Sequence, residues 1–181
     1  MSGESGVVVF RNVDLPRLRR LAELLHEHLP SQVVIALEGT LGAGKTRFVQ
    51  ELAGAAEIDP ADVTSPTFTL VQHYQGSRTL HHIDAYRLAD EDEFIELGGE
   101  ELFEDDAWVL VEWPQRIAAS LPNRTLFLEI EIDAPAGAAE HPDADLPAST
   151  RTLRGHSRDP ELRAALLAIE RQWVASGGAD R

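Results

Sequence analysis

The chain has 181 residues, 43% of them hydrophobic and 6% aromatic, which is typical of an ordinary globular protein with a core for one α/β domain. Sixteen basic and 31 acidic residues give a formal net charge of -15, which argues against direct, electrostatically driven binding of nucleic acid. The chain contains no cysteine, so disulfides, thiolate metal sites and cysteine nucleophiles are excluded.

The N-terminal sequence MSGESGVVVF lacks a basic segment followed by a long apolar one, so it does not resemble a secretory signal. No apolar run approaches the length needed to span a membrane. We therefore expect a cytoplasmic protein without a membrane partner.

The first elements alternate between strand and helix. The β-branched run Val7–Phe10 indicates an edge strand. Asp14 is typical of a helix N-cap, and leucines recur at helical spacing from Leu15 until Pro30 ends the pattern. The apolar run Val33–Ala36 then predicts a buried strand.

A glycine-rich turn follows this strand. Residues Gly39–Thr46 fit G-x-x-x-x-G-K-[ST], in which backbone N–H groups wrap a phosphate. The predicted helix Thr46–Ala56 would present its positive end to the same phosphate. A chance match to a glycine-rich turn is the alternative, but the strand before and the helix after favour a phosphate-binding loop.

Two side chains of this loop carry specific chemistry. Lys45 would reach the β- and γ-phosphates, and the Thr46 hydroxyl would ligate Mg²⁺. Gly42 and Gly44 permit the backbone conformation and the close approach of an anion.

The middle of the chain predicts a β-hairpin. A turn-prone cluster, Thr64–Thr67, precedes the alternating run Phe68–Tyr74, and Thr79–Ile83 indicates a second strand. Thr67 could offer its hydroxyl to Mg²⁺ or water, or it could simply belong to a turn that feeds the strand. Composition leaves both readings open.

Four further elements follow the hairpin. Asp90–Leu97 is typical of a helix with an acidic first turn, and Ala107–Val111 of a central parallel strand. Gln115–Leu121 predicts a short helix after Pro114, and Thr125–Ile132 alternates as a half-exposed, antiparallel strand does.

The C-terminal part begins with a segment free of basic residues. We expect residues 134–149 to be a mobile acidic loop, Thr150–Arg154 a return strand, and the stretch from Asp159 a final helix. Residues 176–181 should fray. The whole chain, 1–181, is expected to form a single domain.

Acidic residues at strand ends are the other candidates for chemistry. Glu112 closes the Ala107–Val111 run, where a P-loop protein places a carboxylate that organises Mg²⁺ and the attacking water. Asp84 ends the preceding strand, and either a metal or water role or a capping role fits it. His81 and His82 should point to opposite faces of that strand, so we expect each to be packed or hydrogen-bonded rather than to share a metal.

Four motifs occur in a defined order: Gly39–Thr46, Ser65–Val71, His82–Leu88 and Val111–Pro114. Together they closely resemble the TsaE family, the bacterial ATPase needed to make threonylcarbamoyladenosine in tRNA. The resemblance runs from about Phe10 to Arg154. The loop motif is shared by many nucleotide hydrolases, whereas the three later motifs in this order are specific to the family.

The resemblance implies an α/β fold, a P-loop NTPase-like three-layer sandwich with a mixed, partly antiparallel sheet. It implies ATP as substrate, Mg²⁺ as cofactor and hydrolysis that is weak alone and stimulated by two partners. One partner, TsaD, transfers the threonylcarbamoyl group, and the other, TsaB, is its scaffold. Contact with tRNA would be indirect, through this complex, which agrees with the net charge of -15.

The resemblance also assigns site residues by position. The catalytic set is Lys45, Thr67, Asp84 and Glu112, and the metal set is Thr46, Asp84 and Glu112. The nucleotide would be held by Leu15, Gly39, Leu41, Gly42, Ala43, Gly44, Lys45, Thr46, Trp113 and Arg151. Of these, Leu15 and Arg151 would lie near the base.

Two other classes of function also use a phosphate-binding loop. A small-molecule kinase usually has an arginine-bearing lid over the phosphates, but arginines after the loop are scattered singly in this sequence. A non-catalytic, nucleotide-sensing module is disfavoured by Glu112 and Asp84. Single-turnover rates with and without partners would distinguish it from an ATPase.

Overall fold

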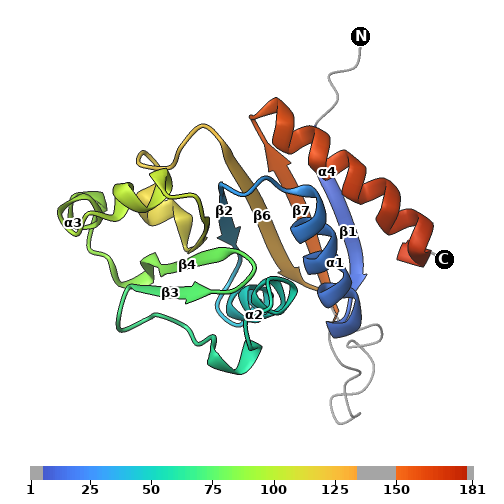
Figure 1. The fold of residues 1–181 in the computed structure, drawn as a ribbon, viewed down its shortest axis with the longest axis horizontal. Helices are drawn as coiled ribbons and strands as arrows, with labels where there is room; N and C mark the ends of the chain where they lie inside the picture. Colours follow the sequence, from blue (N-terminus) through green and yellow to red (C-terminus); the bar gives the residue numbers. More distant parts are fainter. Residues whose placement is uncertain (1–5, 134–149, 179–181) are drawn as a thin grey trace, which may run out of the picture.

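The computed structural model describes residues 6–133 and 150–178. A seven-stranded sheet with the order β1-β7-β6-β2-β5-β4-β3 forms its centre (Figure 1). The strands are β1 (Val8–Val13), β2 (Val33–Glu38), β3 (Val71–Gln75), β4 (Thr79–Asp84), β5 (Trp108–Glu112), β6 (Thr125–Ile132) and β7 (Arg151–Ser157). The α-helices are α1 (Leu15–His28), α2 (Lys45–Ala55), α3 (Glu91–Glu96) and α4 (Pro160–Trp173).

The sheet is mixed, as predicted. Strands β6, β2, β5 and β4 run parallel to one another, whereas β3 pairs antiparallel with β4, and β7 pairs antiparallel with both β6 and β1. The predicted hairpin and the central position of β5 are confirmed. The prediction for Thr125–Ile132 is half wrong, because this strand is antiparallel to β7 but parallel to β2.

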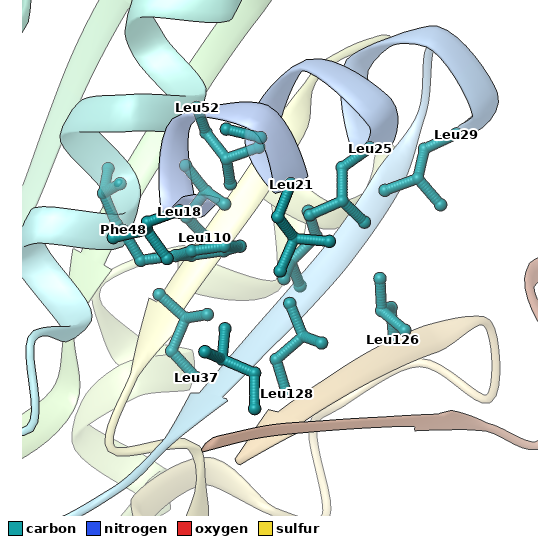
Figure 2. Packing of buried hydrophobic residues seen from close by; sticks show 14 of the residues in the cluster. Leu18, Leu21, Leu25, Leu29, Leu37, Phe48, Leu52, Leu110, Leu126 and Leu128 are labelled. Atoms are coloured by element: carbon teal, nitrogen blue, oxygen red, sulfur yellow. The ribbon is translucent and has the colours of Figure 1, made fainter. Parts of the chain in front are cut away.

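Helices α1, α2 and α4 supply the residues that cover one face of the sheet. Figure 2 shows Leu18, Leu21 and Leu25 of α1 and Phe48 of α2 facing the sheet. Leu21, Leu25 and Phe48 are completely buried. The opposite face packs against α3 and two short 3₁₀ segments, η3 (Gly99–Glu104) and η4 (Pro114–Ile117). The α/β layering inferred from the sequence is therefore confirmed.

Two predicted element boundaries are wrong, and tight turns explain both. The strand expected from Phe68 begins only at Val71, because the N–H groups of Thr69 and Leu70 both donate to the Pro66 carbonyl, at 3.0 and 2.8 Å. The helix expected over 115–121 is only the 3₁₀ segment η4, followed by another three-residue hydrogen bond from Ser120 N to Ile117 O.

The C-terminal predictions are only partly covered. The acidic loop 134–149 lies outside the described residues. The helix after Asp159 is present as α4, and Asp159 caps it by accepting from the N–H groups of Glu161 and Leu162. Where the sequence indicated fraying, a π-helical turn, Val174–Gly178, continues the chain, and residues 179–181 are not described. No helix within the described ranges is long and apolar enough to cross a membrane.

Candidate functional site

The candidate site lies at the carboxyl ends of three neighbouring parallel strands. The glycine-rich loop follows β2, Asp84 ends β4 and Glu112 ends β5. Asp84 and Glu112 are paired residues in the parallel β4–β5 ladder, and Leu37 of β2 pairs with Glu112 from the other side. Ligands of parallel α/β sheets bind at this edge, so the topology brings together the residues that the sequence singled out.

Glycine at position 39 is required by a close approach of β6. Gly39 has φ 151°, and a Cβ on this residue would lie 2.6 Å from the carbonyl oxygen of Ile130. At the other end of the loop, Gly44 caps α2 with φ 107°. The loop therefore passes close to β6 and leads directly into the N-terminus of α2, where backbone N–H groups lack partners within the helix.

Glu112 is held by two side chains from different elements. Thr46 Oγ1 donates to Glu112 Oε1 at 2.7 Å, and His82 Nε2 donates to the same oxygen at 2.9 Å. Glu112 is 4% exposed and His82 is fully buried. The carboxylate is thus held directly beside the Thr46 hydroxyl of the glycine-rich loop.

Asp84 organises the segment that precedes β3. Its Oδ2 accepts from Thr67 Oγ1 at 2.7 Å and from Ser65 Oγ at 3.1 Å, while its Oδ1 accepts from the backbone N–H of Tyr86 at 3.1 Å. The sequence left open whether Thr67 offers its hydroxyl to Mg²⁺ or water, or only forms part of a turn. In the structure Thr67 lies in the turn, and its hydroxyl contacts the strand-end carboxylate of Asp84.

Lys45 lies in the centre of the site. Its Nζ donates to the carbonyl oxygens of Gly39 and Thr40, at 2.9 and 3.0 Å, and lies 3.9 Å from the ring centroid of Trp113. Trp113 adopts the left-handed conformation, with φ 60°, directly after β5. This backbone conformation is uncommon for a bulky residue, and here it brings the indole over the ammonium group.

We expect the pKa of Lys45 to lie below its ordinary value. Burial disfavours the ammonium form, and the carboxylates of Glu112 and Asp84 oppose this shift only in part. A lowered pKa means that the unfolded chain binds more protons just below pH 10.5, so this residue's contribution to stability rises with pH in that window.

The measurement is unusually direct, because Lys45 is the single lysine of the chain. With ¹³Cε-labelled lysine, an NMR titration follows one signal. Glu112→Gln should lower the pKa further, whereas Glu129→Gln, on β6, should leave it unchanged. A lysine that titrates at its ordinary value in the folded protein would contradict the buried position of the ammonium group.

The oxygen donors of the site fit a magnesium ion. Thr46 and Glu112 offer a hydroxyl and a carboxylate in direct contact, and Asp84 adds a second carboxylate on the neighbouring strand. Mg²⁺ prefers such hard oxygen ligands and is usually held by one or two carboxylates together with substrate phosphates. Within the described residues no group of three or more His, Cys, Asp and Glu side chains gathers as a self-sufficient metal cage.

Leu15 and Arg151 line a different hollow from Asp84. They line one hollow with Val13, Leu18 and Ala43. Arg151 Nε donates to the Ala43 carbonyl at 2.8 Å. This hollow shares Gly44 and Arg47 with the one that contains Thr67, Asp84, Glu112 and Trp113, so the two are adjacent.

Two residues of the candidate site, His82 and Tyr86, were not predicted from the sequence to belong to it. His82 was expected to be packed or hydrogen-bonded, which is confirmed, but its partner is Glu112 itself. The position of His82, two residues before Asp84, could have indicated that it lies in the site, because side chains at that spacing share one face of a strand. Tyr86 lines the site, and its ring lies 5.0 Å from that of Trp113.

His81 does not join the site. Its Nδ1 lies 2.8 Å from Nδ1 of His73, and its Nε2 donates to Asp105 Oδ2 at 2.9 Å. The expectation that His81 and His82 would not share a metal agrees with these separate hydrogen bonds.

The chain is similar in sequence to known proteins. Residues 14–140 match the family model described as "Threonylcarbamoyl adenosine biosynthesis protein TsaE". Proteins called "tRNA threonylcarbamoyladenosine biosynthesis protein TsaE" are similar in sequence. The one from Aquifex aeolicus is 44% identical over 115 residues, which is 62% of this chain and 78% of the relative. The one from Bacillus subtilis is 37% identical over 123 residues, or 67% and 76%.

The fold is also similar to a solved structure. The crystal structure of YdiB from Bacillus subtilis superposes with a TM-score of 0.66, at 26% sequence identity. The match covers 92% of this chain and 95% of that one.

Proposed function

Because the chain belongs to the TsaE family of tRNA threonylcarbamoyladenosine biosynthesis proteins, we propose that it hydrolyses Mg·ATP and acts on a TsaD–TsaB-like heterodimer. The family is an ATP-binding one whose members are generally ATPases, and this part of the assignment follows from membership. The hydrolysis by this chain, its Mg²⁺ and its two partners are the proposal.

One observation carries the proposal: the contact of Thr46 Oγ1 with Glu112 Oε1, at 2.7 Å, beside the Lys45 ammonium group. It joins the phosphate loop to the strand-end carboxylate, the combination that hydrolytic P-loop sites require. A binding loop alone would not need a buried carboxylate in this position.

The residues have distinct roles in this proposal. The loop from Leu41 to Thr46 and its Gly39 hold the phosphates, and Lys45 exchanges its carbonyl contacts for phosphate oxygens. Thr46, Glu112 and Asp84 would hold Mg²⁺, which would offset the charge of the phosphates. Trp113 covers the site, and Leu15 and Arg151 contact the base.

In the chemical step, water attacks the γ-phosphorus, the bond to the β–γ bridging oxygen breaks, and ADP leaves with that oxygen. In this proposal one of the two strand-end carboxylates, Asp84 or Glu112, orients the water and accepts its proton. Thr67, bonded to Asp84, shares this side of the site. Hydrolysis then resets the partner complex, and the chain forms no bond on the tRNA base itself.

In this proposal residues 1–181 form one ATPase domain. The tRNA is held by the partner proteins and not by this chain. The net charge of -15 supports an indirect role, since a polyanion would be repelled rather than bound.

Affinity capture from the native lysate, with and without Mg·ATP, tests the partners. We expect a TsaD-like and a TsaB-like protein to co-purify in an amount that depends on Mg·ATP. The reason is that an ATPase that acts on a partner complex has to bind that complex differently with and without nucleotide. Recovery of neither protein in either condition would contradict the proposal, while a lysate that contains both by immunoblot serves as the control.

A further inference from the structure

Two strongly exposed apolar side chains lie beside the candidate site. Phe68 is 86% exposed and Leu97 is 62% exposed. They line the same hollow, together with Thr67, Asp84 and Arg87. Thr67 and Asp84 also line the hollow of the phosphate loop. The apolar hollow and the nucleotide hollow are therefore neighbours that share a hydrogen-bonded pair.

Phe68 is held outward by its surroundings. The turn that carries it is closed by hydrogen bonds from Thr69 and Leu70 to Pro66, and Leu70 adopts a left-handed backbone with φ 64°. Arg87 lies 4.4 Å above the Phe68 ring. A single exposed apolar residue needs no explanation. An exposed phenylalanine on a constrained turn, with an exposed leucine lining the same hollow, is typical of an interaction site.

Asp84 connects this turn to the nucleotide site. It accepts from Ser65 and Thr67 on one side, and it caps the 3₁₀ segment η2 (Ala85–Arg87) that carries Arg87 on the other. Asp84 therefore contacts both the turn that carries Phe68 and the segment that carries Arg87.

The charge next to this hollow selects the kind of partner. Residues 90–106, which contain α3 and η3, include ten acidic residues and no basic one. Figure 1 shows α3 at the β3–β4 side of the sheet, away from α4. Such a surface repels nucleic acid and anionic lipid, and it attracts a protein surface rich in lysine and arginine.

We propose that Phe68 and Leu97, flanked by the acidic segment 90–106, form a docking surface for a basic protein surface with an apolar pocket. The inference rests on the proposed function, because it places the heterodimer partner of the ATPase there. A partner docked at this surface lies against Thr67 and Asp84. The nucleotide state then affects partner binding through the position of Phe68.

The test measures the affinity of the full chain for the purified TsaD–TsaB-like heterodimer by titration calorimetry in the presence of Mg·ATP. Phe68→Ala should weaken binding by about tenfold or more, as expected for an aromatic anchor, and Leu97→Ala should weaken it to a smaller degree. Nucleotide binding by the isolated Phe68→Ala protein should be unchanged. Leu167→Ala, at an apolar residue of α4 that is 45% exposed, is the matched control and should bind as wild type does.

Charge is tested in parallel. Glu96→Lys should weaken the complex and reduce its dependence on salt, whereas Glu27→Lys, on α1, should do neither. Wild-type affinity in both Phe68→Ala and Glu96→Lys would overturn the docking surface and leave the proposed function intact. A wild-type chain that binds no heterodimer would overturn the proposed function itself, and loss of tRNA binding by Phe68→Ala in the absence of any protein partner would make RNA the occupant instead.

Discussion

Lys45→Ala is expected to abolish ATP binding and, with it, partner-stimulated hydrolysis. Lys45 carries the one ammonium group of the site, and its hydrogen bonds to the Gly39 and Thr40 carbonyl oxygens hold that group beside the glycine-rich loop. Each charge-assisted hydrogen bond to a phosphate contributes about 1.5–3 kcal/mol, and several are lost together. Titration with a fluorescent ATP analogue and a phosphate-release assay measure the two effects.

Folding can be separated from function in this variant. The substitution removes a buried charge that is partly desolvated, so the thermal unfolding midpoint should not fall as it does after loss of a core residue. Arg20→Ala, an exposed cation of α1 paired with Glu23, is the control and should hydrolyse ATP as wild type does. If Lys45→Ala hydrolysed ATP like wild type with partners present, the assignment of the site would be wrong.

Glu112→Gln is expected to lower turnover by a factor of about 10²–10⁴, the usual contribution of a positioned acid–base group, and to change ATP affinity much less. The amide keeps the shape of the side chain and an oxygen for Thr46 and His82, but it removes the negative charge. The ATP affinity and the single-turnover rate of the same preparation give the two quantities.

Glu129→Gln, on β6, is the matched control and should leave both quantities unchanged. Wild-type turnover in Glu112→Gln would show that this carboxylate does not organise the reaction. A fall in affinity as large as the fall in turnover would reduce its role to holding the nucleotide and its metal.

Much of the fold could be predicted because its signals are local. The leucine spacing after Asp14 produced α1 with the expected cap, and the apolar runs before Gly39 and Glu112 produced the two parallel strands of the site. The orientation of β6 could not be predicted fully. The alternation of apolar and polar residues in β6 indicates that one face of the strand is exposed to solvent. It does not indicate the direction of the neighbouring strands, because β6 pairs with β2 and β7, which are distant from it in the sequence.

The wrong prediction that a strand begins at Phe68 has a different cause. The residues from Phe68 to Tyr74 alternate as a strand does, but their first part forms a turn with Leu70 in the left-handed region. A pattern of side chains does not reveal a backbone conformation that few residues adopt. The same holds for Trp113, whose left-handed backbone brings its ring over Lys45.

The site itself could be predicted better as a set of residues than as a geometry. The glycine-rich loop, Thr67, Asp84 and Glu112 were all indicated by motif or by their position at a strand end, and they lie together. The hydrogen bond of His82 to Glu112 was missed because a histidine in a strand has several equally good explanations until its neighbour is known. Its partner on the adjacent strand lies thirty residues away in the sequence.

The central claim is that this chain hydrolyses ATP in response to a protein partner. Single-turnover hydrolysis of ATP with Mg²⁺, with and without saturating purified TsaD–TsaB-like heterodimer, tests it most directly. We predict slow hydrolysis by the chain alone, clear stimulation by the heterodimer, and no stimulated rate in the Lys45→Ala variant. Equal rates with and without a heterodimer that demonstrably binds would contradict the claim and leave a nucleotide-sensing module in its place.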